Sequence, residues 1–206
     1  LVAIAAASGS AFATDGYFAH GYGMKAKGMG GAATAMASDA LGGANNPASM
    51  VFAGSRLDLG VDLFMPKRDA ERTGTGSPLD GKVESDKTSF YVPELGYNRV
   101  INNKMGIGVT VYGNGGMNTD FAGGQIPAGS CGPAAANLLC GSGKVGIDMM
   151  QLIVAPTLGY KLSDAHSVGV SPLIIHQRFK ADGLQMFSSM SASPANVSSN
   201  GYDTSN

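Results

Sequence analysis

Two basic side chains close an apolar stripe near residue 178, and no other pattern in the chain is better suited to bind a charged ligand. His176 and Arg178 follow four apolar residues on the face that alternate residues of a strand would share. A cation beside an apolar surface can receive a carboxylate that carries an apolar tail, because a buried charge without a partner is costly. Arg178 could instead lie in a polar surface band, since the opposite strand face is equally apolar and the facing is undecided. The apolar members of the stripe are Val168, Val170, Pro172 and Ile174.

The chain offers no pattern typical of catalysis or of a metal site. Its histidines, His20, His166 and His176, are scattered along the sequence. The glycine pairs at 30–31 and 42–43 lack the Lys and Ser or Thr that complete a phosphate-binding loop. A hydrolase needs a nucleophile with a neighbouring base, and no such set is evident. We therefore expect a protein that is not an enzyme and that uses neither a metal nor a cofactor.

Two cysteines, Cys131 and Cys140, lie in a loop rich in Gly, Pro and Ala. Their spacing matches neither a zinc motif nor a CxxC redox motif. A disulfide that closes an exposed loop is the preferred interpretation, and it agrees with an exported protein. Two free thiols are the alternative.

Composition excludes several classes of protein. The 206 residues carry a formal net charge of -1 and only 14% charged residues, so nucleic acid is not an expected partner. No run of about eighteen apolar residues occurs, which excludes a transmembrane helix. Membrane-spanning strands escape that test, because each needs only about nine to eleven alternating residues.

The N-terminal residues 1–13 resemble the end of an export signal. An apolar stretch leads to Ala11-Phe12-Ala13, an A-x-A cleavage pattern, although a basic region before it is missing. An Ala-rich helix start is the alternative.

Residues 14–54 are expected to form a small plug, or hatch, inside a larger structure. Small side chains bury too little area to offset the entropy of ordering the chain, but they allow close backbone approach. A short helix is expected within residues 25–37 and a loop over residues 39–47, with Gly42 and Gly43 in a gating role. The segment closes on Asn46-Pro47-Ala48, a tight turn beside the pocket or an anchor to the first strand. Met50 and Phe52 follow, and either substrate contact or a core role is equally expected.

Residues 55–206 have the period-two pattern of strands. In residues 56–63, Leu57, Leu59, Val61 and Leu63 share one face while Asp58 and Asp62 share the other. We expect the two carboxylates to face the interior and to pair with hatch cations such as Lys25 or Lys27. Further strands are expected over residues 89–100, 105–112, 145–162 and 167–180, with a bulge or kink at Pro93.

Long connections alternate with short ones along these strands. Residues 67–86 and 113–144 are long loops, whereas 99–104 and 163–166 are short turns. Together with the apolar faces, this alternation is typical of an all-β, antiparallel transmembrane β-barrel. A soluble β-sandwich would place its polar face outward. About five strands of a larger barrel are expected here, because an open sheet edge in hydrocarbon would leave backbone groups unpaired. The chain is therefore expected to continue beyond Asn206.

Several separated segments resemble the outer-membrane transporters of the long-chain fatty acid (FadL) family. They are GMGGAATAMASDALGGANNPASM, PELGYNRVINNKMGIGVTVYGNGGMNTDF and IVAPTLGYKLSDAHSVGVSPLIIHQRF, in this order. The resemblance implies a barrel of about fourteen strands with an N-terminal hatch, in the outer membrane of Gram-negative type. It also implies passive transport of long-chain fatty acids or other hydrophobic compounds, which leave sideways through a gap at an inward kink of an early strand. By alignment with the family, Arg178 falls at a carboxylate-binding position.

The expected partners are therefore an apolar small molecule, membrane lipid and lipopolysaccharide, with a monomeric protein. In the alternative interpretation, Arg178 lies outside the membrane and contacts lipopolysaccharide phosphate or water. A structural or adhesive surface barrel would keep the fold without an apolar ligand. A porin for small polar solutes would need a charged lumen, which the low charge content disfavours.

Overall fold

The computed structural model describes residues 18–36, 38–199 and 201–206. The expected export signal at residues 1–13 lies outside these residues. The strands are β1 (Arg56–Phe64), β2 (Asp69–Arg72), β3 (Gly81–Glu84), β4 (Phe90–Val100), β5 (Met105–Phe121), β6 (Val145–Lys161), β7 (Ser167–Val170), β8 (Ile174–Asp182) and β9 (Asp203–Ser205). The helical turns are α1 (Met24–Gly28), α2 (Gly42–Asn45), η1 (Pro47–Phe52), η2 (Gln185–Met190) and η3 (Pro194–Asn196).

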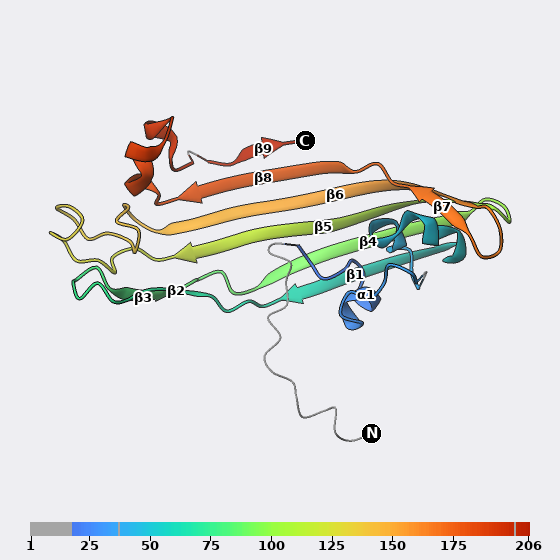
Figure 1. Cartoon of the computed structure of the whole chain (residues 1–206), viewed down its shortest axis with the longest axis horizontal. Helices are drawn as coiled ribbons and strands as arrows, with labels where there is room; N and C mark the ends of the chain where they lie inside the picture. Colours follow the sequence, from blue (N-terminus) through green and yellow to red (C-terminus); the bar gives the residue numbers. More distant parts are fainter. Residues whose placement is uncertain (1–17, 37, 200) are drawn as a thin grey trace, which may run out of the picture.

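One long antiparallel sheet dominates the structure (Figure 1). Its strand order is β1-β4-β5-β6-β8-β9, and β7 pairs with the end of β6 beside β8. Within the described residues β1 and β9 are its edges, so the sheet is open. The long connections gather at one end of the strands and the short turns at the other, as Figure 1 shows. The prediction of an all-β antiparallel fold is thereby confirmed.

The strands have one apolar exposed face and one face toward the N-terminal residues. In β1, Leu59 is 72% exposed and Val61 59% exposed, while Asp58 and Asp62 on the opposite face are partly buried. This is the predicted division of β1 into an aliphatic face and a carboxylate face. No helix among the described residues is long and apolar enough to cross a membrane.

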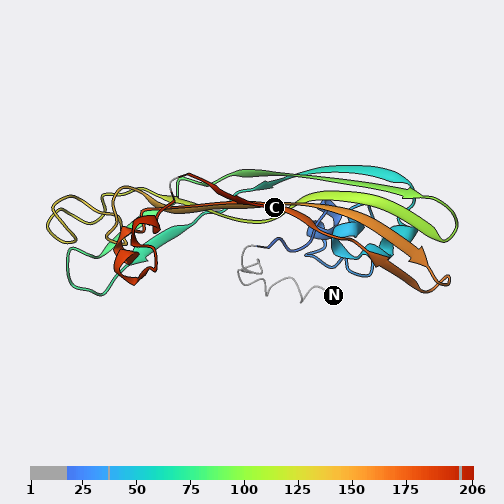
Figure 2. The same cartoon turned by 90° about the horizontal axis from the view of Figure 1, so that it is seen from above.

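The N-terminal segment (residues 18–54) lies against the second face of the sheet, near the short turns. The end of the sheet curls around this segment, which Figure 2 shows from above. The predicted helix over residues 25–37 is limited to α1, because residues 30 and 31 are glycines with positive φ. The loop predicted over residues 39–47 contains the short helix α2 instead.

Three further predictions about strands were wrong in detail. The polar loop predicted over residues 67–86 holds a two-stranded hairpin, β2 and β3. The third strand continues beyond residue 112 to Phe121, because it stays paired with β6. The fifth predicted strand is divided into β7 and β8 at Ser171-Pro172-Leu173, where the proline has no N–H for the ladder.

The predicted bulge at Pro93 is also absent. The pairing of β1 with β4 runs through Val61↔Pro93 without a shift of register. The irregularity lies instead in β5, between Gly113 and Gly115. The proline is tolerated because the pairing of β4 with β5 reaches only Glu94, so Pro93 has a partner strand on one side alone.

Candidate functional site: the N-terminal segment and the wall beside it

A buried ion pair fastens the N-terminal segment to the strands. The ammonium of Lys27 in α1 lies 3.2 Å from Glu94 Oε2 and 3.2 Å from Asp62 Oδ2. The Gly23 N–H also donates to Glu94 Oε2, at 3.1 Å. The Glu94 side chain is only 3% exposed, and its other oxygen, Oε1, is buried with no hydrogen-bond partner among the described residues. The predicted pairing of Asp62 with a lysine of the N-terminal segment is confirmed, and Glu94 proves to be the more deeply buried acid.

A second carboxylate of β1 binds the backbone of the N-terminal segment. Asp58 accepts hydrogen bonds from the Ala40 N–H, at 2.9 Å, and from the guanidinium of Arg56, at 2.6 and 2.8 Å. Its cationic partner is thus a neighbour on β1 and not Lys25, which donates to the Ser38 carbonyl. Asp39 stands close by, and its burial raises the pKa of its carboxyl above the usual value. Two acids therefore share this contact, and Arg56 offsets their repulsion.

The Asn-Pro-Ala turn is packed against β7. Asn46 caps η1 by accepting a hydrogen bond from the Ala48 N–H, and Pro47 occupies the first position of that helix. Ser167 Oγ donates to the Ala48 carbonyl at 2.8 Å. A Cβ atom at Gly169 would lie 2.4 Å from the carbonyl carbon of Pro47, so this strand position requires glycine. The turn therefore touches the wall directly.

Gly42 and Gly43 lie in α2 at positions with no room for a side chain. A Cβ at Gly43 would lie 2.5 Å from Thr110 Oγ1 and 2.7 Å from Thr157 Oγ1. A Cβ at Gly42 would lie 2.7 Å from Ser49 Oγ. Both glycines thus permit close packing of the segment on β5 and β6, and their gating role stays a prediction.

Asn98 on β4 makes a fully buried polar contact between the wall and this segment. It is 0% exposed, and its Nδ2 donates to the carbonyls of Met50, at 2.8 Å, and Gly54, at 2.7 Å. Met50 is also 0% exposed, which places it in the packed interface. Phe52 is 46% exposed and has the ammonium of Lys161 5.2 Å from its ring centroid.

Replacing Asn98 with Ala should destabilise this interface by about 1–3 kcal/mol, because the buried Met50 carbonyl would lose its donor, whereas the partly buried Gly54 carbonyl can turn to water. Urea unfolding of the protein in phospholipid vesicles, followed with hydrogen exchange of residues 47–54, would measure the loss. Asn103→Ala is the matched control, since Asn103 is exposed in the short turn before β5. Equal stability of the two variants would contradict the role given to Asn98.

The wall itself is interrupted between β4 and β5. Their ladder runs from Val100↔Gly106 only as far as Glu94↔Tyr112, and the next bridge is Ser85↔Phe121, near the long loops. The outer neighbours show no such break: β1 stays paired with β4 as far as Phe90, and β5 with β6 as far as Phe121. The interruption is therefore local, and Figure 1 shows β4 and β5 diverging there.

The start of the N-terminal segment lies at this interruption. Phe18 forms an isolated bridge with Gly115 on β5. The Tyr22 hydroxyl donates to the side chain of Asn114, the residue at the β5 irregularity, and the Tyr22 ring lies 4.3 Å from the Tyr112 ring, centroid to centroid. Asn114 continues by a hydrogen bond to Gln151, so the contact extends into β6. Displacement of the segment would therefore break contacts with the irregular stretch of β5.

The structure does not bring the predicted strand-five residues to the N-terminal segment. In the pairing of β6 with β8, Ile174, His176 and Arg178 stand opposite Val154, Leu152 and Met150, on the face away from that segment. Arg178 lies toward the long loops, with its guanidinium 4.8 Å from the Tyr202 ring centroid. His176 is hydrogen-bonded to Asn206. The structure therefore assigns Arg178 to the exposed sheet face, and its carboxylate-binding role stays a prediction.

Glu94, Asn98 and Asn114 are among the residues of this interface that were missed in the sequence. Glu94 and Asn98 alternate with Gly96 on one face of β4, opposite Leu95 and Tyr97. In β1, polar residues on one face and apolar residues on the other predicted which face turns inward. The same pattern in β4 could have identified Glu94 and Asn98. Asn114 follows a glycine and precedes two more, a pattern that marks an irregular strand.

The two cysteines are joined by a disulfide in the loop between β5 and β6, far from these contacts.

A comparison with family models matches residues 1–204 to the family described as "Outer membrane protein transport protein (OMPP1/FadL/TodX)". A comparison with curated proteins finds no match.

Proposed function

Since the chain belongs to the family of outer-membrane transport proteins that includes FadL and TodX, we propose that it carries long-chain fatty acids or similar apolar molecules across the outer membrane. The antiparallel strands belong to the wall of the family's β-barrel, with their apolar face toward lipid. The N-terminal segment is the hatch, held inside that wall, and transport needs no energy input.

The observation that carries this proposal is the interruption of the wall between β4 and β5 beside the hatch. Backbone groups in hydrocarbon must be paired, so a barrel that serves only as a structural wall would gain nothing from an unpaired stretch. A sideways exit for an apolar molecule needs such an opening. The contacts of Phe18 and Tyr22 with residues 114 and 115 support a hatch that governs this exit.

The connection that follows β8 and contains η2 and η3 presents an apolar surface, which supports capture of an apolar substrate from outside. In η2, Met186 is 58% exposed, Phe187 39% and Met190 77%. Methionine side chains are flexible and polarizable, so they adapt to apolar ligands of different shapes. A porin for polar solutes would have no use for such a surface. We propose that apolar substrate first adsorbs here and then passes to a site beside the hatch.

Uptake of a labelled long-chain fatty acid tests the proposal, in cells that lack their own transporter and express the full-length protein. Uptake above that of cells with an empty vector is expected. Arg178→Ala should reduce it if this guanidinium receives the carboxylate; unchanged uptake would move the head-group site elsewhere. Absence of uptake for every apolar compound tried would favour the structural or adhesive barrel.

Cross-linking β4 to β5 at the interrupted stretch of the wall should prevent release of the substrate. A Cβ at Gly113 would lie only 2.9 Å from Val92 Cγ1, so cysteines at these two positions can be bridged. Treating the Val92→Cys/Gly113→Cys variant with a short thiol cross-linker should lower uptake by about tenfold or more, because opening by even a few Å is prevented.

The matched control is Leu95→Cys/Val111→Cys, a pair in the intact part of the β4–β5 ladder. Cross-linking it should leave uptake unchanged, since these residues are already held together. A cross-linked Val92/Gly113 variant that transports normally would exclude an exit between β4 and β5.

A further inference from the structure

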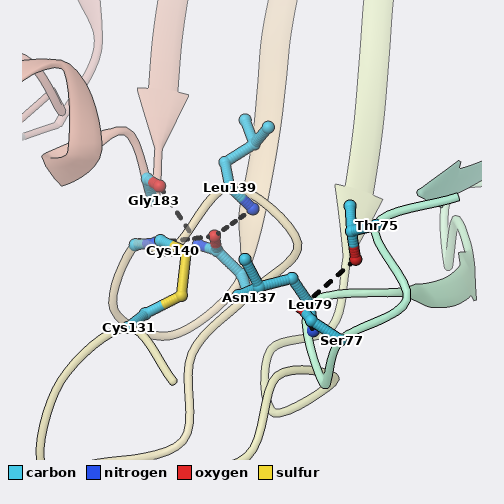
Figure 3. The surroundings of a disulfide bond; sticks show 9 residues. Thr75, Ser77, Leu79, Cys131, Asn137, Leu139, Cys140 and Gly183 are labelled. Carbon is cyan, nitrogen blue, oxygen red and sulfur yellow. Dashed lines mark hydrogen bonds between the residues drawn. A yellow bond between two sulfur atoms is a disulfide. The ribbon is translucent and has the colours of Figure 1, made fainter. Parts of the chain in front are cut away.

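The disulfide between Cys131 and Cys140 closes a ring of residues where three external connections meet. One is the β2–β3 hairpin, the second is the loop between β5 and β6 that contains the ring, and the third begins after β8 (Figure 3). The ring packs on the hairpin through an apolar cluster. The cluster contains Ile126, Ala136 and Leu138, which are 0–6% exposed, with Ala70, Leu79 and Val83 of the hairpin region against them.

Asn137 is the residue through which the ring reaches the third connection. It is 0% exposed, and its Oδ1 accepts hydrogen bonds from the N–H groups of Leu139 and Gly141, both at 2.9 Å. Its Nδ2 donates to the Gly183 carbonyl at 3.1 Å. All three of these hydrogen bonds go to backbone groups, and Figure 3 marks the one that joins the Asn137 amide to Gly183.

The backbone around this contact has little freedom to adjust. Among the described residues other than glycine, Cys140 alone has a positive φ, of 57°. A conformation that L residues rarely adopt persists only where surrounding contacts enforce it, and here those are the disulfide and the Cys140 N–H donated to the Asn137 carbonyl at 2.9 Å. A Cβ at Gly141 would lie 2.0 Å from the Gly183 carbonyl oxygen, so the two segments are in direct backbone contact.

The apolar helix η2 begins two residues after Gly183, the residue that Asn137 contacts. Gln185, its first residue, accepts a hydrogen bond from the Ser142 N–H at 2.9 Å, just beyond the ring. We propose that the disulfide ring, acting through Asn137, is a positioning device that holds the apolar η2 surface at the external mouth for substrate capture. The inference rests on the proposed transport function, and reduction of the disulfide should weaken capture without touching the hatch or the exit.

The test uses the full-length protein and two independent readouts. Chymotrypsin cleavage after Phe187 reports how often η2 detaches, and fatty acid uptake reports capture. In Cys131→Ser/Cys140→Ser, and in the unmodified protein treated with dithiothreitol, cleavage after Phe187 should accelerate about tenfold, as expected when local opening loses a buried contact. The Km for uptake should rise by a similar factor of about ten while the maximal rate stays the same, because only capture is affected.

Asn137→Asp separates the role of the side chain from that of the ring. Aspartate keeps the acceptor for Leu139 and Gly141 but loses the donor to Gly183, so it should reproduce the cleavage and Km changes with the disulfide intact. Asn196→Asp, at an exposed position of η3, is the matched control and should change neither.

Unchanged cleavage at Phe187 after reduction and in Asn137→Asp would overturn the inference. So would faster cleavage accompanied by a lower maximal rate at constant Km, since that would place the ring's effect after capture. If the unmodified protein takes up no apolar compound, the transport function fails, while the cleavage comparison still decides whether the ring holds η2.

Discussion

Replacing Lys27 with Met should release the N-terminal segment, the proposed hatch, from the wall. The substitution keeps much of the side-chain volume. Within the described part of the chain it leaves Glu94, whose side chain is 3% exposed, with one donor, the Gly23 N–H. Removing one partner of a buried ion pair typically costs about 3–5 kcal/mol, because the remaining charge is left uncompensated in a poorly solvated site. Asp62, which is 33% exposed, loses its partner as well and can turn to water.

Protease accessibility of residues 18–54 in isolated outer membranes would measure this release, together with ion conductance of the purified protein in planar bilayers. Both should rise in Lys27→Met. Lys82→Met is the matched control, because the Lys82–Asp69 pair lies on the exposed hairpin with both side chains about half exposed. It should leave both readouts unchanged.

A double variant tests whether the effect of Lys27→Met comes from the unpaired Glu94 carboxylate. If the cost of Lys27→Met comes from the stranded carboxylate, then adding Glu94→Leu should restore much of the protection, since the charge is removed with its partner. A double variant as accessible as Lys27→Met alone would mean that Lys27 acts through packing and not through Glu94.

The sequence predicted the strands well because each one carries a simple alternation of apolar and polar residues. Leu57, Leu59, Val61 and Leu63 predict both the strand and its apolar face, and in the structure all four side chains are exposed. The prediction of a β-barrel wall needed only this pattern and the alternating loop lengths. The alternation does not predict the register between strands. The wall interruption depends on that register, so the sequence pattern could not predict it.

The site was less predictable for the same reason. Arg178 and His176 were singled out by their place in a stripe, but which face of β8 they occupy depends on the pairing Met150↔Arg178. The hatch contacts are tertiary: Lys27 and Glu94 are 67 residues apart in the chain. Single-sequence reasoning could therefore propose that carboxylates meet hatch lysines, as it did for Asp62, without identifying the deeper acid.

Glycines of both the N-terminal segment and the wall make their contact possible, and only those of the segment were singled out in the sequence. The small residues before residue 50 predicted close backbone approach, and Gly42 and Gly43 do sit where a Cβ atom would collide with neighbouring side chains. On the wall, a Cβ atom at Gly96 would collide with the Ala40 backbone, and one at Gly169 with the backbone of Pro47 and Ala48, although neither glycine has a positive φ. Their small size, and not their backbone freedom, admits the hatch.

Gly169→Ala should therefore displace the Asn-Pro-Ala turn. Its methyl group would lie 2.4 Å from the Pro47 carbonyl carbon and 2.5 Å from the Ala48 nitrogen, and these are backbone atoms that cannot rotate away. Overpacking of a tight interface costs about 1–3 kcal/mol or more, and here η1 would have to leave β7 and carry the buried Met50 with it. The Ser167 hydrogen bond to the Ala48 carbonyl would be lost in the same movement.

Hydrogen exchange measured by mass spectrometry would locate the effect. Peptides covering residues 40–54 should exchange at least about tenfold faster in Gly169→Ala, whereas peptides from β6 should keep their protection, because the ladder of the wall is untouched. Gly28→Ala is the control, since a Cβ at Gly28 meets nothing within 4 Å and alanine favours the helix. Faster exchange in β6 as well would mean that the hatch and the wall unfold together, and unchanged exchange over residues 40–54 would show that the turn does not depend on its contact with Gly169.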